Sequence, residues 1–184
     1  MEGASGLVGH FRAMARNNAW SNRRLYDACL RLSPEAFTAT RTSFFPSISL
    51  TLNHILEVDL YYLDGLEDGG RGASIFETYV PDHDARSLWA AQAAADRRLI
   101  AFCDGVTDEG LARTVHLDRG RRGKMPDPAG GILAHLFVHQ IHHRGQVHAM
   151  LSGTDVKPPQ LDEYFLAEDH RQAGCELADI GLAR

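Results

Sequence analysis

The stretch AHLFVHQIHHRGQVHAML, residues 134–151, holds five of the ten histidines of this 184-residue chain. Apolar residues recur along it every three or four positions, which predicts one helix. His139 and His143 are four residues apart, so in a helix of 3.6 residues per turn they project from the same face, one turn apart. Two imidazoles arranged in this way can bind one metal ion.

The histidine pair lies within an apolar stripe of this predicted helix. Six residues fall within about 60° of a common direction when each residue turns by about 100°: Ile132, Leu136, His139, His143, Val147 and Met150. At the margins of the stripe lie His135, His142 and Gln146, which we interpret as supporting residues or surface residues. His148 points the opposite way and is predicted to be a surface residue. The back of the helix is also apolar, which favours a central helix or one that meets a partner subunit.

Composition describes an ordinary globular protein, with 44% hydrophobic and 23% charged residues. The length predicts a single domain over residues 1–184. A formal net charge of -5 and a pI near 6.0 provide no overall attraction to nucleic acid or to an anionic membrane. The three cysteines have no paired spacing, and we find neither a signal peptide nor a membrane span. These features predict a cytoplasmic protein with free thiols.

Four long helices are expected from the spacing of apolar residues, at about 5–32, 47–67, 84–103 and 128–151. Ser33 and Ser47 are predicted N-caps, the first followed by Pro34 at the start of a short helical turn. A long glycine-containing connection separates the second helix from the third, and a short hairpin or loop precedes the fourth. A short amphipathic tail, residues 161–173, is expected to pack across the bundle. The fold class predicted is therefore all-α.

A third histidine, His54, also lies on an apolar stripe, in the second predicted helix. Four-helix bundles build metal sites from side chains on facing helices, and a shared cation would offset the cost of burying several imidazoles. The alternative is that His54, His139 and His143 are separate core histidines hydrogen-bonded to polar neighbours. Sequence spacing alone leaves both interpretations open and does not identify a third ligand.

Other polar residues in the pattern also have two interpretations. Asn18 interrupts an apolar stripe, where a structural hydrogen-bonding role is favoured over a catalytic one. The chain's only basic cluster is Arg119, Arg121, Arg122 and Lys124. This cluster is interpreted as a solvated loop, with an anion-gathering rim beside the histidines as the alternative.

Several motifs resemble the DinB family, which is related to a wider group that includes mycothiol-dependent maleylpyruvate isomerase and bacillithiol transferases. The first-helix match is AWSNRRLYDACLRLSPEAF at 19–37, and the second is SISLTLNHILEVDLYYLDGL at 47–66. SLWAAQAAADRRL at 87–99 matches the third helix, HLFVHQIHHRGQVHAML at 135–151 the fourth, and KPPQLDEY at 157–164 the segment that follows. The resemblance covers nearly the whole chain, and HxxHHRGQ is its most specific part.

The resemblance implies a four-helix bundle with up-down-down-up topology, a long crossover after the second helix, and commonly a homodimer. It also implies a metal triad of His54, His139 and His143. The family is named for DNA damage induction, which describes the regulation of some members and not a contact with nucleic acid.

Three neutral imidazoles would leave a divalent ion its full charge and an open coordination position, as in catalytic sites. Gln140 follows His139, so the glutamate base of the HExxH metalloprotease motif is missing and proteolysis is disfavoured. The triad also differs from the two-histidine, one-carboxylate site of many non-haem iron oxygenases. Glu57 and Asp59 could supply a carboxylate, but both are expected to point away from the His54 face.

The leading hypothesis is a metal-dependent thiol S-transferase or hydrolase acting on a small electrophile. Zinc or nickel is the first expectation for the ion, with iron, cobalt or manganese as alternatives. The resemblance to thiol-dependent relatives suggests a low-molecular-weight thiol, whose carboxylates the basic loop could hold. The alternative is a non-catalytic, stress-associated dimer stabilised by its metal. DNA binding through the basic loop is a third, weaker hypothesis, because the net charge is negative.

Overall fold

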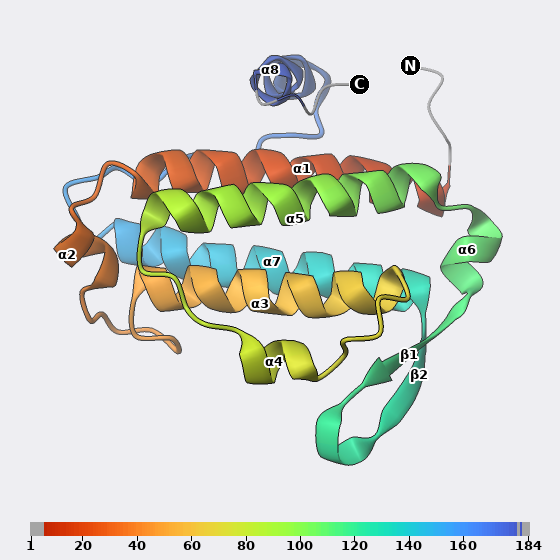
Figure 1. Cartoon of the computed structure of the whole chain (residues 1–184). Coiled ribbons are helices and arrows are strands. Elements are labelled where there is room, and N and C mark those ends of the chain that lie inside the picture. The colour runs from red at the N-terminus through yellow and green to blue at the C-terminus, as the bar shows by residue number, and fades with distance from the viewer. Residues whose placement is uncertain (1–5, 180, 182–184) are drawn as a thin grey trace.

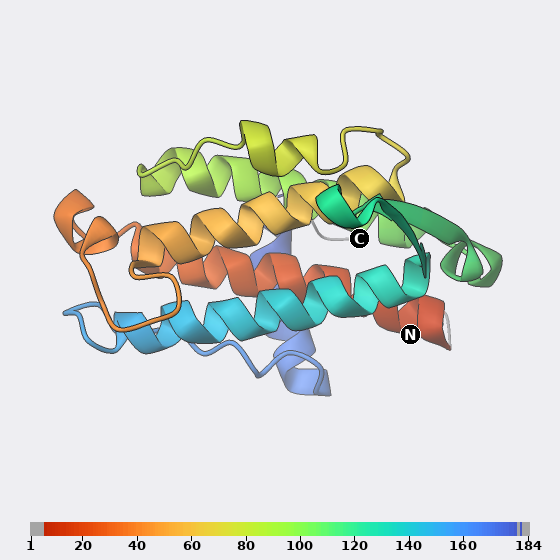
Figure 2. The ribbon, with the colours of Figure 1, turned by 90° about the horizontal axis from the view of Figure 1, so that it is seen from below.

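The computed structural model describes residues 6–179 and 181, and most of them are helical. Four long helices lie side by side (Figures 1 and 2): α1 (Leu7–Cys29), α3 (Ile48–Leu66), α5 (Ala85–Gly105) and α7 (Ala129–Leu151). Helices α1 and α7 run in one direction, and α3 and α5 run in the other (Figure 1). Contacts pair α1 with α5 and α3 with α7, and they also join the two pairs. The prediction of a mostly helical fold is confirmed.

Polar caps set where several of these helices begin. The Ser33 side chain accepts a hydrogen bond from the Ala36 amide at the start of α2 (Pro34–Thr38), and Ser47 accepts one from Leu50 at the start of α3. Both caps were predicted from the sequence. Asp84 caps α5 in the same way, accepting from the amides of Arg86 and Ser87. Each cap satisfies backbone donors that have no partner within the helix.

The connection between α3 and α5 passes along the outside of the long helices and contains α4 (Ser74–Thr78). After α5 come α6 (Asp108–Ala112) and a hairpin of β1 (Thr114–Asp118) and β2 (Lys124–Pro128), joined by the short 3-10 helix η1 (Gly120–Arg122). The strands are antiparallel, with Thr114 opposite Pro128 and Asp118 opposite Lys124. The sequence left hairpin and loop open here, and the structure has the hairpin.

The hairpin is fixed to α3 by close packing at Gly65. Leu117 is buried, and a Cβ atom added at Gly65 would lie 2.5 Å from its Cδ2 atom. A side chain at residue 65 would force the Leu117 side chain to shift, since such a separation is far inside van der Waals contact. The part of β1 next to the turn of the hairpin therefore packs against α3.

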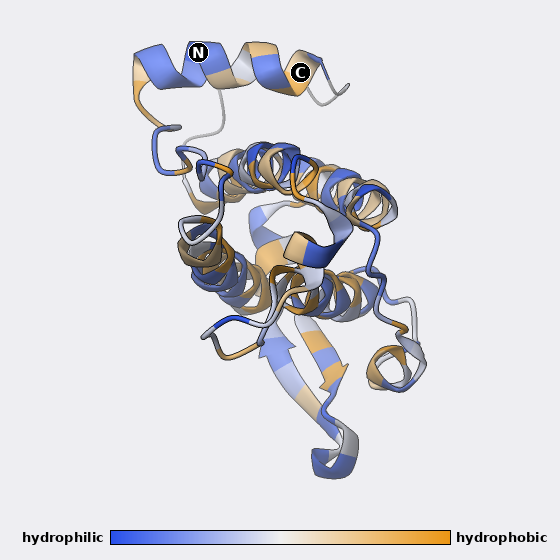
Figure 3. Cartoon of the chain, turned by 90° about the vertical axis from the view of Figure 1, so that its left-hand side faces the viewer, coloured by the Kyte–Doolittle hydropathy of each residue, from blue (hydrophilic) through white to orange (hydrophobic). Residues whose placement is uncertain are grey.

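The last helix among the described residues is α8 (Ala167–Ala178), which lies across the outside of the long helices, on the side opposite the hairpin (Figure 3). Arg24 of α1 binds Glu176 of α8 at 2.6 Å, and the rings of Trp20 and Tyr164 are 5.4 Å apart. The helix begins and ends later than the predicted tail at 161–173, because the chain stays irregular up to Leu166. No helix among the described residues is long and apolar enough to cross a membrane.

Core packing on α7 provides a test of the fold. Leu136 is fully buried, whereas Val138, two residues away, is 65% exposed. Leu136→Ala should lower the free energy of unfolding by about 2–5 kcal/mol, because it removes buried methyl groups and leaves a cavity. Val138→Ala should change it by less than about 0.5 kcal/mol. Urea denaturation of both variants checks this, and equal effects would contradict the assigned orientation of α7.

Candidate metal centre

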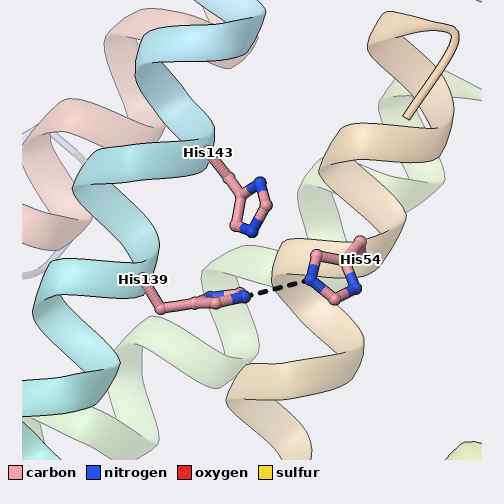
Figure 4. Close-up of side chains that lie close together, drawn as sticks. All are labelled: His54, His139 and His143. Atoms are coloured by element: carbon pink, nitrogen blue, oxygen red, sulfur yellow. Dashed lines mark hydrogen bonds between the residues drawn. The ribbon is translucent and has the colours of Figure 1, made fainter. Parts of the chain in front are cut away.

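Three histidines from two helices converge at one point between α3 and α7 (Figure 4). His54 comes from α3, and His139 and His143 come from α7. The Nε2 atoms of His54 and His139 are 3.0 Å apart, and one nitrogen from each of the three rings lies within 4.8 Å of the others. His143 is buried and the other two are half-buried. The structure thus brings together the three residues that the sequence singled out.

The three imidazoles are neutral at pH 7. Burial lowers the pKa of His54 to about 4 and that of His139 to about 3, and repulsion from the neighbouring histidines acts in the same direction. Burial also lowers the pKa of His143, although its bond to Gln146 partly opposes the shift. A neutral imidazole keeps a lone pair on one ring nitrogen, which is the state that binds a metal ion.

The orientation of His143 is set by a polar chain along α7. Its Nδ1 atom lies 2.8 Å from Gln146 Oε1, and Gln146 Nε2 lies 3.1 Å from His142 Nε2. Gln146 accepts through its oxygen and donates through its nitrogen, so His143 Nδ1 carries the hydrogen and Nε2 carries the lone pair. His139 differs, because its buried Nδ1 atom has no hydrogen-bond partner among the described residues.

A divalent ion fits this donor set. Nitrogen ligands about 2.0–2.1 Å from a tetrahedral zinc ion would be about 3.3 Å apart. The His54 and His139 Nε2 atoms are 3.0 Å apart, and a nitrogen of His143 lies within 4.8 Å of its neighbours. Asp59 does not belong to the cluster, because its carboxylate is buried against Gln92 and Gln140. It therefore points away from His54, as expected. The grouped ligands are three histidines without a carboxylate.

The remaining histidines of α7 have separate positions. The His142 ring centre is 4.8 Å from that of His143, and the His135 ring centre is 6.3 Å from that of His139, so both are neighbours of the triad, as predicted. His148 differs from the prediction of a surface residue. It is half-buried, and its Nε2 atom lies 3.0 Å from the carbonyl oxygen of Pro159, because the segment after α7 folds back over it.

Phe45 forms one wall of the site and was not identified from the sequence. Its ring centre lies 4.2 Å from that of His54 and 5.7 Å from that of His143. The residue belongs to the irregular loop between α2 and α3, where no periodicity indicates which side chain turns inward. An aromatic wall excludes water from one side of the imidazoles and lowers the local polarity.

A pocket of about 620 Å³ opens onto the triad, between α3, α4, α7 and the tip of the hairpin. Much of its lining is aromatic or apolar, including Tyr61, Tyr62 and Phe76. Arg119 is the only lysine or arginine among the described residues that line it, whereas Arg121 and Arg122 are exposed elsewhere on the hairpin. Each interpretation of the basic cluster therefore applies to part of it: Arg119 lies at the rim of the pocket, and the other basic residues are solvated.

Behind the triad, a buried polar network joins all four long helices. On one side of it, Asp96 of α5 accepts hydrogen bonds from Asn18 and Asn22 of α1 at 3.1 and 3.0 Å. Gln92 Nε2 donates to Asp59 of α3 at 2.8 Å and lies 3.3 Å from Asp96. The structural role predicted for Asn18 is thus confirmed.

On the other side of the network lies Arg144 of α7, a guanidinium that is only 4% exposed. It donates to the side-chain oxygens of Asn18, Asn22 and Gln140. Gln140 in turn donates to Asp59, which ties α7 to α3 beside His139. Sequence reasoning missed Gln140 and Arg144, although two polar residues four apart on an otherwise apolar helix are a usable signal.

The network contains two buried acids and one buried base. Burial raises the pKa of Asp59 to about 7 and that of Asp96 to about 6, while hydrogen bonds and the charge of Arg144 oppose these shifts. Burial lowers the pKa of Arg144 to about 10, which leaves it protonated at pH 7. One ionised carboxylate is enough to balance the charge of the guanidinium. The other of the two buried acids is therefore more stable when it is protonated.

Two unpaired atoms favour Asp59, rather than Asp96, as the acid that takes up a proton. Asp59 Oδ1 and Gln92 Oε1 are both buried without partners in the described part of the chain. The other two atoms of these groups are already paired with each other, because Gln92 Nε2 donates a hydrogen bond to Asp59 Oδ2. A proton on Asp59 Oδ1 would turn one of these two unpaired acceptors into a donor.

This assignment predicts opposite effects for two isosteric substitutions in metal-free protein. The raised pKa of Asp59 gives wild-type protein a contribution to stability that is complete below about pH 4 and is lost as the pH rises to about 7. Asp59→Asn cannot ionise, so its free energy of unfolding should rise relative to wild type across that range. Asp96→Asn should lower it by about 3 kcal/mol, because Arg144 loses its charge partner. Denaturation from pH 4 to 8 measures both, and a larger loss for Asp59→Asn would contradict the assignment.

Comparisons with known proteins agree with this architecture. The family model described as "DinB family" matches residues 7–173. The curated Protein DinB of Bacillus subtilis (strain 168) is 24% identical over 139 residues, which cover 73% of this chain and 80% of that protein.

Two crystal structures of DinB-like proteins have a similar fold. The protein from Bacillus subtilis aligns with a TM-score of 0.59 and 16% identity, covering 80% of this chain and 96% of the other. The protein from Bacillus cereus ATCC 10987 also has a TM-score of 0.59, with 18% identity, covering 77% and 90%. Because the family model matches residues 7–173, which are most of the chain, the chain belongs to the DinB family.

Proposed function

We propose that the chain is a metal-dependent enzyme in which His54, His139 and His143 hold one divalent cation. The proposed reaction is thiol-dependent S-transfer to a small electrophile, or the corresponding hydrolysis. The observation that carries the proposal is the convergence of three neutral imidazoles beside a pocket of about 620 Å³. Structural metal sites are closed by four protein ligands, whereas three ligands beside an open pocket leave a position for a reactant.

In this proposal a bound divalent ion supplies Lewis acidity that lowers the pKa of a thiol or water molecule beside it. The residues of the chain hold and orient the reactants. Gln146 accepts the hydrogen of His143 Nδ1, so that the lone pair of this ring lies on Nε2. The aromatic pocket wall positions the electrophile and limits access of water. The thiol sulfur forms a bond to the electrophilic carbon as the leaving group departs with its electron pair, and the thiol proton passes to solvent.

Zinc or nickel is the proposed ion, with iron, cobalt or manganese as alternatives, since imidazole ligands suit several of these metals. The scaffold proposed for the site is a four-helix bundle with up-down-down-up topology, which the directions of the long helices support.

A homodimer is also part of the proposal. The exposed Val138 and Ile141 on α7 support it, because apolar side chains on one helix face favour association.

Metal binding is tested with two alanine variants of neighbouring histidines. Wild-type protein should bind about one zinc or nickel ion per chain, measured by equilibrium dialysis with metal analysis. His139→Ala should weaken the affinity by at least about 100-fold, because it removes one of three ligands. The control, His142→Ala, lies on the same helix outside the triad and should change the affinity by less than about tenfold. Equal losses in both variants would refute the triad.

Activity is tested by conjugating model electrophiles to bacillithiol, mycothiol or glutathione, and by following hydrolysis without thiol. Turnover should disappear when a chelator removes the metal and return when zinc or nickel is restored. His139→Ala should lose activity in parallel, whereas His142→Ala should retain most of it. Turnover that is unchanged by metal removal would exclude the proposed mechanism.

A second candidate function is a metal-stabilised protein without catalysis. The observation that favours it is that the triad joins α3 to α7, so an ion there would crosslink two helices of the core. Bound metal stabilises the folded state by mass action. If His143→Ala lowers the melting temperature of metal-loaded protein strongly and no thiol or hydrolytic assay shows turnover, this alternative is supported over the enzyme.

A further inference from the structure

We propose that the pocket takes a small molecule with a carboxylate at one end and an apolar body, and that Arg119 binds the carboxylate. This carboxylate subsite extends the proposed function. It rests on that function only in one respect, namely that the end of the ligand opposite the carboxylate would reach the histidine triad and react there. The carboxylate subsite itself is defined by residues of the hairpin and α3.

Arg119 has a fixed place at the pocket rim. It directly follows β1, whose Leu117 is buried against Gly65 of α3. The backbone carbonyl of Asp118 accepts a hydrogen bond from the Tyr61 hydroxyl at 2.6 Å, and its side chain accepts one from the Gly120 amide at 2.9 Å. These contacts hold the turn on both sides of Arg119, so its guanidinium is presented to the pocket by a defined backbone.

Among the described residues, the Arg119 guanidinium has only loose partners. Its Nη1 atom is 3.4 Å from the Tyr62 hydroxyl, its Cζ atom is 5.8 Å from the centre of the Tyr62 ring, and its Nη2 atom is 3.8 Å from Asp127. In contrast, Arg24, Arg98 and Arg113 bind their carboxylates at 2.6–2.9 Å. An arginine has five donors in a planar fork, so Arg119 keeps donors that can bind a carboxylate with two parallel hydrogen bonds.

An aromatic wall connects this arginine to the triad. The ring centre of His135 lies 5.4 Å from that of Tyr62, and the ring centre of His139 lies 6.3 Å from that of His135. Phe76 and Val58 also line the pocket. A ligand with one end at Arg119 and the other at the triad therefore lies along an apolar surface, which selects an aromatic or aliphatic body.

The charge of the rim favours a carboxylate over a phosphate group. Glu77 and Asp118 also line the pocket, and the Asp118 carboxylate is already bound to the Gly120 amide. A dianionic phosphate would meet these two acids with a single arginine to offset them, whereas a carboxylate brings one charge that Arg119 neutralises. The geometry thus points to a monoanionic end group.

The test uses metal-free protein, so that no metal ion competes for the carboxylate. The probes are 3-phenylpropionate and its neutral counterpart 3-phenylpropanamide, with phenethyl phosphate as a third probe, and affinities are measured by NMR titration at pH 7.5. Wild-type protein should bind the carboxylate about tenfold more tightly than the amide. This factor is at the lower end of the range expected for a charge-assisted hydrogen bond, because the arginine is partly exposed. The phosphate should bind more weakly than the carboxylate.

The matched variants are Arg119→Gln and Arg121→Gln, which change the net charge equally within the same turn. Arg119→Gln should abolish the preference for carboxylate over amide while leaving amide binding unchanged, and Arg121→Gln should keep the preference. Arg119→Lys should keep part of it, because the charge remains but the fork is lost. No preference in wild type, equal effects of the two glutamine variants, or tighter binding of phosphate would overturn the inference.

This design separates the inference from the proposed function. Binding of the probes does not require metal or turnover, so a carboxylate preference that depends on Arg119 stands even if the triad binds no ion. Conversely, metal-dependent thiol transfer without such a preference would support the enzyme and refute the carboxylate subsite.

Discussion

The buried guanidinium of Arg144 is the constraint on which the rest of the structure depends. A charge that is 4% exposed must have acceptors and a counter-charge, or its desolvation would oppose folding. Arg144 obtains its acceptors from α1 and α7, and the acids that offset its charge come from α3 and α5. All four long helices must therefore adopt one register for the cation to be satisfied. Apolar packing alone would tolerate small shifts of a helix, whereas directional hydrogen bonds do not.

The same network positions the histidines. Gln140 and Arg144 each directly follow one of the α7 histidines, and adjacent residues of a helix point about 100° apart. One side of α7 is thus held by the bond from Gln140 to Asp59, and the neighbouring side presents His139 and His143 to His54. Because Asp59 and His54 are both on α3, this bond limits movement between the two helices that carry the three histidines. Ordered second partners of this kind keep metal ligands in place.

Structure outside the long helices decides what can approach the triad. The loop between α2 and α3 brings Phe45 against His54, and the hairpin brings Arg119 to the pocket rim. The long helices hold the imidazoles, and these shorter segments define the shape and charge of the space beside them. Function in many folds follows this division between a rigid scaffold and variable connections.

The sequence by itself determined the helical class, two N-caps and the pairing of His139 with His143, because these depend on local periodicity and spacing along one element. His139 and His143 share a helix face by geometry, and His54 was identified by its place in a second apolar stripe and by the family resemblance. Only the tertiary structure decided that Asp59, Gln140 and Arg144 form one network, that Phe45 turns inward, and that Arg119 alone of the basic cluster reaches the pocket. These contacts join residues up to 126 positions apart in the chain. Their existence depends on how elements pack, and local sequence carries no direct record of that packing.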